Sequence, residues 1–146
     1  MPHTDRHDLQ DRFGPEQIRR LTTTLERFRD LPHAIGDLAA LGVDRFHMHV
    51  SDGSTRFHGD RFYQAYGAAL YARMDVSDVT DPELLERAYR LFQSEVTDLR
   101  TFLGHSADAG VEMLVVHVRE RAVTFLDPQG RVLGVHPIGI PAERMN

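Results

Sequence analysis

The residues best suited to chemistry in this 146-residue chain are three histidines and two arginines that alternate with other residues over a short stretch. Imidazole groups titrate near neutral pH and can act as acids and bases, while guanidinium groups bind carboxylates and phosphates. Successive side chains of a β-strand point to opposite faces, so we expect all five on one face. This histidine face consists of Arg45, His47, His49, Arg56 and His58.

The dipeptide Asp52-Gly53 lies between the two halves of this stretch and predicts a β-hairpin. A two-residue type I′ turn favours this dipeptide, because both central residues need a positive φ. Directly opposed side chains then have Cβ atoms about 5 Å apart. With a two-residue loop, the opposed pairs are expected to be His49 with Arg56 and His47 with His58.

We interpret the histidines as candidate acid–base groups and the arginines as ligands for an anionic group. Neighbouring cations lower the proton affinity of an imidazole and leave it neutral near pH 7. Tyrosines that follow the hairpin could form the wall of a pocket beside it. The candidate catalytic residues are His47, His49 and His58, and the candidate ligand-binding residues are Arg45, Arg56, Tyr63, Tyr66, Tyr71 and His117.

Residues 30–58 resemble residues 98–126 when the sequence is shifted by 68 positions, with nine of 29 pairs identical. Ordinary composition would give about two identical pairs. We interpret this as an internal duplication of a helix–Gly–strand–strand unit. The predicted fold class is α+β, a single domain with a continuous antiparallel sheet built from the two units and packed against helices.

The second predicted hairpin is apolar on both faces, since Val115 and Leu126 stand where the first has His47 and His58. A strand that is apolar on both faces is usually covered on both. We therefore expect the second hairpin at the centre of the sheet, with Met113, Val115 and Leu126 covered, in a homodimer or otherwise. The first hairpin is expected to leave one face open.

Periodicity and turn residues predict the remaining organisation. A flexible arm is expected at 1–14, a single domain at 15–138 and a tail at 139–146. Asp81 and Pro82 begin a long helix, which we expect to kink at Gly104 and to end at Gly110. Residues 60–80 are the least readable, with a short edge strand near 70–76. A turn at 127–130 leads into a last strand at 131–138.

The composition excludes several kinds of chemistry. There is no cysteine, and all 17 basic residues are arginine, which excludes thiol nucleophiles, thiolate metal sites and Schiff-base or P-loop lysines. The net charge of −5 disfavours attraction to nucleic acid or anionic lipid. Apolar runs are too short for a membrane span, and the first residues lack the apolar core of a signal peptide, so we expect the cytoplasm.

Several short motifs resemble the YdfO-like family of small bacterial and prophage-borne proteins of unknown function. The resemblance implies a compact α+β domain with an antiparallel sheet, and it implies no activity or catalytic residue. Where family members carry an acidic residue after the first strand and paired tyrosines after the second, this chain has His49 and Phe57-His58. The matching residues are Leu31-Pro32, Leu38, Gly42 to Phe46, Gln93, Phe102, Ala109 to Val111 and Asp127 to Gly130.

These observations leave several functions open. The histidine face could bind a small anionic molecule and carry out acid–base chemistry, or the chain could be a non-enzymatic module that self-associates. His-x-His on one strand with a histidine on the next could also hold a metal ion, as open zinc sites use three ligands. A merely solvated, charged face is the simplest alternative. Neither a cofactor nor a substrate can be named from the residues.

Overall fold

The computed structural model describes residues 31–59 and 64–139. The predicted N-terminal arm, the C-terminal tail from 140 and Tyr63 lie outside these residues. Within them there are three helices and six strands. The helices are α3 (Leu31–Ala40), α4 (Pro82–Gln93) and α5 (Leu99–Asp108), and the strands are β1 (Val43–His49), β2 (Thr55–Gly59), β3 (Gln64–Gly67), β4 (Met113–His117), β5 (Ala122–Leu126) and β6 (Val132–Pro137).

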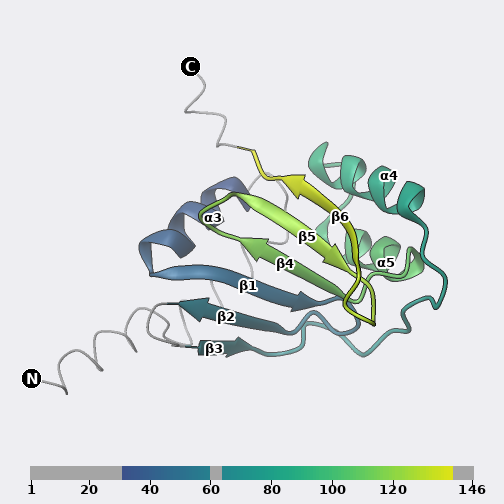
Figure 1. Ribbon diagram of the computed structural model, residues 1–146, viewed down its shortest axis with the longest axis horizontal. Coiled ribbons are helices and arrows are strands. Elements are labelled where there is room, and N and C mark those ends of the chain that lie inside the picture. Colours follow the sequence, from purple (N-terminus) through teal and green to yellow (C-terminus); the bar gives the residue numbers. More distant parts are fainter. Residues whose placement is uncertain (1–30, 60–63, 140–146) are drawn as a thin grey trace, which may run out of the picture.

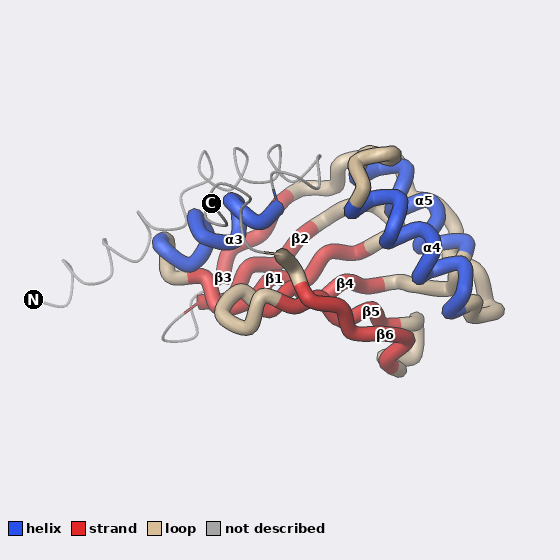
Figure 2. The backbone as a smooth tube through the Cα atoms, turned by 90° about the horizontal axis from the view of Figure 1, so that it is seen from above, coloured by secondary structure: helices blue, strands red, loops and turns tan. Residues whose placement is uncertain are grey.

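All six strands pair antiparallel in one sheet, in the order β3-β2-β1-β4-β5-β6 (Figure 1). The three described helices lie on one side of this sheet (Figure 2). The predicted α+β class with a single antiparallel sheet is therefore confirmed. Because β1 pairs directly with β4, each hairpin contributes one central strand. The second hairpin was expected at the centre of the sheet, and the structure places its first strand there together with the first strand of the first hairpin.

Alternating residues of the four inner strands fill the core between sheet and helices. Phe46 and Phe57 contact each other across β1 and β2, with ring centroids 5.3 Å apart. Tyr89 of α4 and Phe102 of α5 pack on Phe125 of β5, at 5.5 and 6.1 Å between centroids. Because these strand residues face the helices, the residues that alternate with them along each strand must face away from the helices.

The element order helix–strand–strand–strand occurs twice, as α3-β1-β2-β3 and as α5-β4-β5-β6. The bounds of α3 and α5 differ by the same 68 positions that relate the two sequence segments. The two units lie on either side of the β1–β4 pairing. Their origin by duplication remains an inference from the sequence.

The register of the first hairpin differs from the prediction. The His49 N–H donates to the Ser54 carbonyl at 2.9 Å, so four residues rather than two form the loop, and Gly53, with φ +74°, is the last of them. Consequently His47 lies opposite Arg56, and Arg45 lies opposite His58. The faces are nevertheless as predicted, because side chains alternate with a period of two and the pairing moved by two residues.

The helical segment is also divided differently. The chain breaks between α4 and α5, where Glu95 has φ +61°, and Asp98 begins α5 by accepting the Thr101 N–H at 2.8 Å. Gly104 lies inside α5, so the expected kink there was wrong, whereas Gly110 follows the helix with φ +87°. The expected edge strand near 70–76 was also wrong, since the strand of this region is β3.

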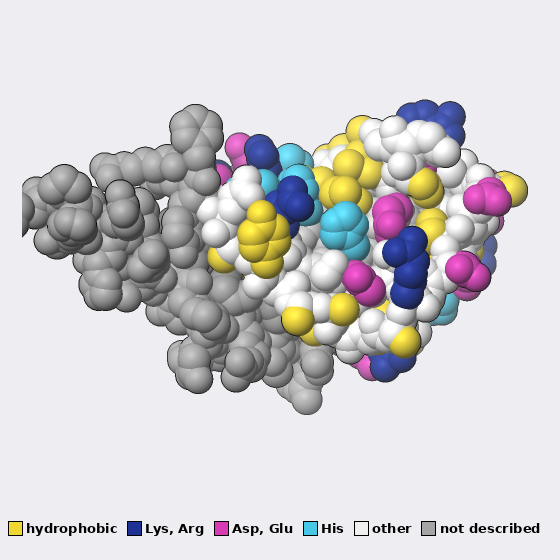
Figure 3. Space-filling model, turned by 90° about the horizontal axis from the view of Figure 1, so that it is seen from below, with side chains coloured by type: hydrophobic (Ala, Val, Ile, Leu, Met, Phe, Trp, Pro, Cys, Tyr) yellow, Lys and Arg dark blue, Asp and Glu magenta, His cyan; other side chains and the backbone are white. Residues whose placement is uncertain are grey.

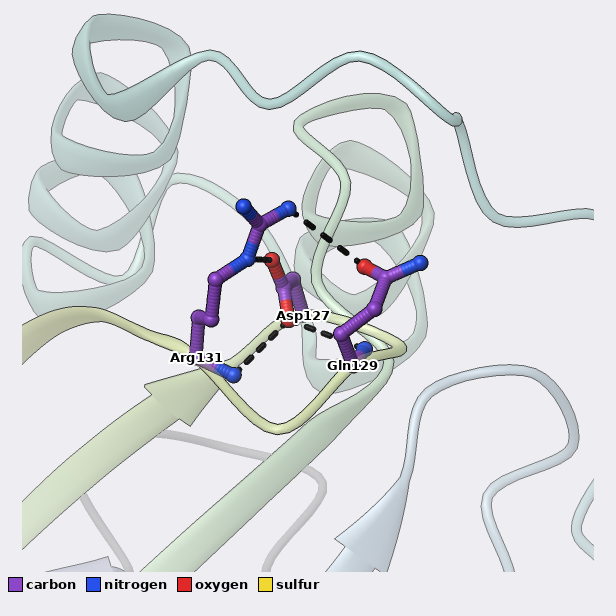
Figure 4. Close-up of polar contacts among 3 residues, drawn as sticks. All are labelled: Asp127, Gln129 and Arg131. Atoms are coloured by element: carbon purple, nitrogen blue, oxygen red, sulfur yellow. Dashed lines mark hydrogen bonds and ion pairs between the residues drawn. The ribbon is translucent and has the colours of Figure 1, made fainter.

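The turn between β5 and β6 formed as predicted, and a buried carboxylate holds it. Asp127 is 3% exposed and accepts the N–H groups of Gln129 and Arg131 at 2.9 and 2.8 Å, together with Arg131 Nε at 2.8 Å (Figure 4). Burial alone would raise the pKa of Asp127, but the hydrogen bonds and charge of Arg131 hold it below its usual value. The turn fixes where β6 begins at the edge of the sheet.

We expect Gly104→Ala to raise the free energy of unfolding by about 0.5–1 kcal/mol, because glycine is costly inside a helix. A Cβ at Gly104 meets no atom within 4 Å. Urea unfolding followed by circular dichroism measures the change. Gly110→Ala is the control and should destabilise, because its Cβ would lie 3.0 Å from Thr80 Cα at a positive φ. A destabilised Gly104→Ala would contradict a regular α5.

Candidate functional site

The histidine face lies on the side of the sheet away from the described helices. Phe46 and Met48 of β1 and Phe57 of β2 are buried in the core on the helix side. The residues between them therefore project from the other face, with both arginines exposed and the three histidines half-buried. Histidine and arginine side chains gather side by side on this part of the surface (Figure 3).

Four residues of this face form a compact group, which we call the basic quartet. His47 is paired with Arg56, and Arg45 is paired with His58, so that two adjacent cross-strand pairs each contain one imidazole and one guanidinium. The rings of His47 and His58 meet diagonally, with centroids 4.8 Å apart and planes tilted by 45°. The sheet thus brings together the four residues despite the changed register.

Neither arginine of the quartet is paired with a carboxylate of the described chain. The ion pairs there involve Arg90, Arg119 and Arg131. Arg56 instead lies over the ring of Tyr66, its opposed residue on β3, at 5.3 Å from the centroid. Two exposed guanidinium groups therefore lie on this face with no neutralising carboxylate among residues 31–59 and 64–139. Such groups offer planar donors for a carboxylate or phosphate.

Both histidines of the quartet are held in the neutral form. Desolvation, followed by the charges of His58, Arg45, Arg56 and His49, lowers the pKa of His47 to about 4. Desolvation and the two arginines also lower the pKa of His58. The Nε2 atom of His58 is buried without a hydrogen-bond partner in the described structure. Neutral imidazoles of this kind can accept a proton or a hydrogen bond.

The other candidate residues on this face surround the quartet. His117 of β4 lies opposite Arg45, and its Nε2 is 3.1 Å from Thr124 Oγ1 on β5. His49 lies further along β1, opposite Met113. Together with Tyr66, they extend the histidine face over four neighbouring strands. Thr124 was not among the predicted site residues, because its contact with His117 is a diagonal one between residues that are not directly opposed.

Tyr71 does not belong to this group. Its hydroxyl donates to the Val50 carbonyl at 2.6 Å, and its ring lies under Arg100 of α5, 5.2 Å from the guanidinium carbon. Burial and the nearby Asp52 raise the pKa of Tyr71 to about 12. The structure thus places this tyrosine against the core beside α5, where it closes the end of the sheet rather than contacting the quartet.

The histidine face lies outside the two cavities found among the described residues. One is a small apolar cavity of about 40 Å³ in the core, and the other, of about 220 Å³, lies beside α5. Neither is lined by the histidine face, and no three His, Asp or Glu side chains in 31–59 and 64–139 are placed to hold a metal ion. The larger cavity is lined by Leu70, Tyr71, Asp98, Leu99, Arg100 and Leu103.

The fold and this face define a class: an α+β protein whose single antiparallel sheet has helices on one side and a cationic cluster on the other. A family model described as "Protein of unknown function (DUF1398)" matches residues 22–136. The chain belongs to this family. No curated protein is similar enough to match it. None of the described helices is long and apolar enough to cross a membrane.

The lowered pKa of His47 predicts a pH dependence of stability. Between the unfolded pKa near 6.5 and the folded pKa of about 4, the unfolded chain binds more protons than the folded one. The contribution of His47 to the free energy of unfolding should therefore be constant above pH 6.5 and decrease as the pH falls toward 4. Thermal unfolding between pH 7 and 4 should show a weaker pH dependence for His47→Val than for the wild type.

NMR titration of the imidazole resonances would test the electrostatic cause directly. Arg56→Gln should move the midpoint of His47 upward, because one of the charges that oppose protonation is removed. Arg119→Gln is a suitable control, since Arg119 pairs with Asp44 outside the quartet. A midpoint near pH 6.5 for His47 in the wild type would contradict the desolvated, cation-surrounded position of this imidazole.

Proposed function

We propose that the protein binds a small anionic molecule at the basic quartet, Arg45, His47, Arg56 and His58. The observation that carries this proposal is the presence of two exposed arginines beside two neutral imidazoles, with no carboxylate of the described chain paired to them. A carboxylate or phosphate could accept hydrogen bonds from both guanidinium groups. Its charge would also offset the repulsion between them.

Both arginines of the quartet are exposed and line neither cavity, which favours binding over catalysis on an enclosed substrate. Enzymes that depend on acid–base groups commonly exclude water from the reacting atoms, and small-molecule sites are usually concave. The quartet could still exchange protons with a bound molecule, since His47 and His58 are neutral bases at pH 7. We therefore propose a binding protein with acid–base capability rather than a defined enzyme.

A closer relation to YdfO-like proteins is part of the proposal. The motif residues in the Gly42 to Phe46 stretch form the entry into β1, and those at 109–111 form the entry into β4. The likeness therefore concerns the central strand pair and includes Arg45 of the quartet, but none of His47, Arg56 and His58. For this reason it supports a shared fold and transfers no site to this chain.

Self-association is a second candidate function. It is favoured by Val132 and Val135 of the edge strand β6, each 60% exposed. Val115 is only 9% exposed, and Met113 and Leu126 are half-buried, so the apolar second face is already partly covered within one chain. A homodimer through this surface remains a prediction, to be separated from anion binding by the solution mass.

The double variant His47→Val, His58→Leu tests the proposed site. Val115 and Leu126 occupy the corresponding positions of the second hairpin, so the variant should keep its fold, with stability unchanged or raised. Binding of inorganic phosphate and of acetate, measured by NMR titration, should be lost. Arg56→Gln should weaken binding about tenfold, as expected for loss of a charge-assisted hydrogen bond.

Arg119→Gln serves as the control for charge, because it also removes one exposed arginine but leaves the quartet intact. It should bind both anions as the wild type does. If the double variant unfolds, the histidines are structural. If it folds and binds both anions with unchanged affinity, the anion site is not the quartet.

A further inference from the structure

Apolar side chains continue the open face from the quartet to the far edge of the sheet. Val115 of β4 lies directly opposite His47, and the same row ends at Val135 of β6, opposite Thr124. A neighbouring row runs from Met113 through Leu126 to Val132. We call this set the apolar strip; it consists of Met113, Val115, Leu126, Val132 and Val135.

The strip becomes more exposed toward the edge. Val115, next to His47, is 9% exposed, whereas Val132 and Val135 are each 60% exposed. Exposed valines on a strand offer apolar surface to any ligand that covers them. The open face thus has a cationic half on β1 and β2 and an apolar half on β4 to β6. The one acidic residue of the described strands is Asp44, at the bulge of β1, and it is paired with Arg119.

We propose that the anion recognised by the quartet carries an apolar chain that lies across this strip, as in a monocarboxylate with an aliphatic tail. This inference rests on the proposed function and names its ligand class. Neighbouring strands are about 4.8 Å apart, so His47 on β1 and Val135 on β6 are separated by roughly 14 Å. Arg56 lies one strand further, on β2, about 19 Å from β6, so a long-chain carboxylate is needed to keep its head group at Arg56 and reach the exposed valines.

The distribution of charge favours such a ligand over a second copy of the chain. A copy packed face to face over the whole sheet would place two sets of uncompensated arginines in one interface. Like charges in an interface oppose association. An amphipathic anion instead neutralises Arg45 and Arg56 with its head group and covers Val132 and Val135 with its tail. Both halves of the face are then complemented by one molecule.

A series of acetate, octanoate, dodecanoate and hexadecanoate, each below its micelle concentration, tests the inference by NMR titration and calorimetry. Full burial of a methylene group would raise the affinity about fourfold. Because the strip covers the tail on one side only, each added methylene group should raise the affinity of the wild type about twofold. The double variant Val132→Asn, Val135→Asn should bind acetate as the wild type does and should lose most of the gain with chain length.

The matched control is Val79→Asn, Val96→Asn, which changes two valines that are 74% and 66% exposed outside the sheet. This control should keep the full dependence on chain length. Equal affinity for all four carboxylates in the wild type would overturn the inference and leave the proposed function standing. Failure to bind any of them, or inorganic phosphate, would overturn both.

Sedimentation of the ligand-free protein tests whether a second copy of the chain, rather than a ligand, covers the apolar strip. A monomeric mass supports the inference. A dimeric mass that falls to monomer in Val132→Asn, Val135→Asn, and not in the control variant, would show that a second copy occupies the apolar strip, which overturns it.

Discussion

The antiparallel pairing of β1 with β4 is the constraint on which the rest of the structure depends. An isolated hairpin is marginally stable in water, and here two hairpins become one sheet by pairing their first strands. Phe46 and Met48 on one strand and Leu114 and Val116 on the other then form a continuous buried face for the helices. The same pairing sets the open face, because Arg45 is brought opposite His117 and His47 opposite Val115.

The boundary between cationic and apolar surface therefore follows this strand pair. The two units have the same strand register. Each has a four-residue hairpin loop, whose last residue, Gly53 or Arg121, has a positive φ. Within that shared register, Val115 and Leu126 show that the fold accepts apolar residues where the first unit has His47 and His58. Desolvating two imidazoles beside two arginines is unfavourable, and no structural requirement of the sheet explains it.

Much of this arrangement could be predicted from local pattern. Strand alternation identified the histidine face, and Gly42 and Gly110 marked the helix ends correctly. The hairpin register was not predicted from Asp52-Gly53 alone, because this dipeptide also fits the end of a four-residue loop. Arg121 at the matching position carried the missing signal, since a two-residue type I′ turn rarely has arginine there. Strand order and the exposure of Val132 and Val135 depend on long-range pairing, which periodicity does not report.

In the proposed mode of binding, electrostatic linkage would couple anion binding to protonation of the histidines. The low pKa of His47 arises from desolvation and from the neighbouring cations, and a bound anion would offset the second of these causes. Binding and protonation would then favour each other, so the affinity for an anion should increase as the pH falls. An apolar tail on the strip would further exclude water from the quartet, which strengthens each of its charge interactions. In the proposed mode of binding, the neutral histidines and the exposed valines would contribute to the same binding event.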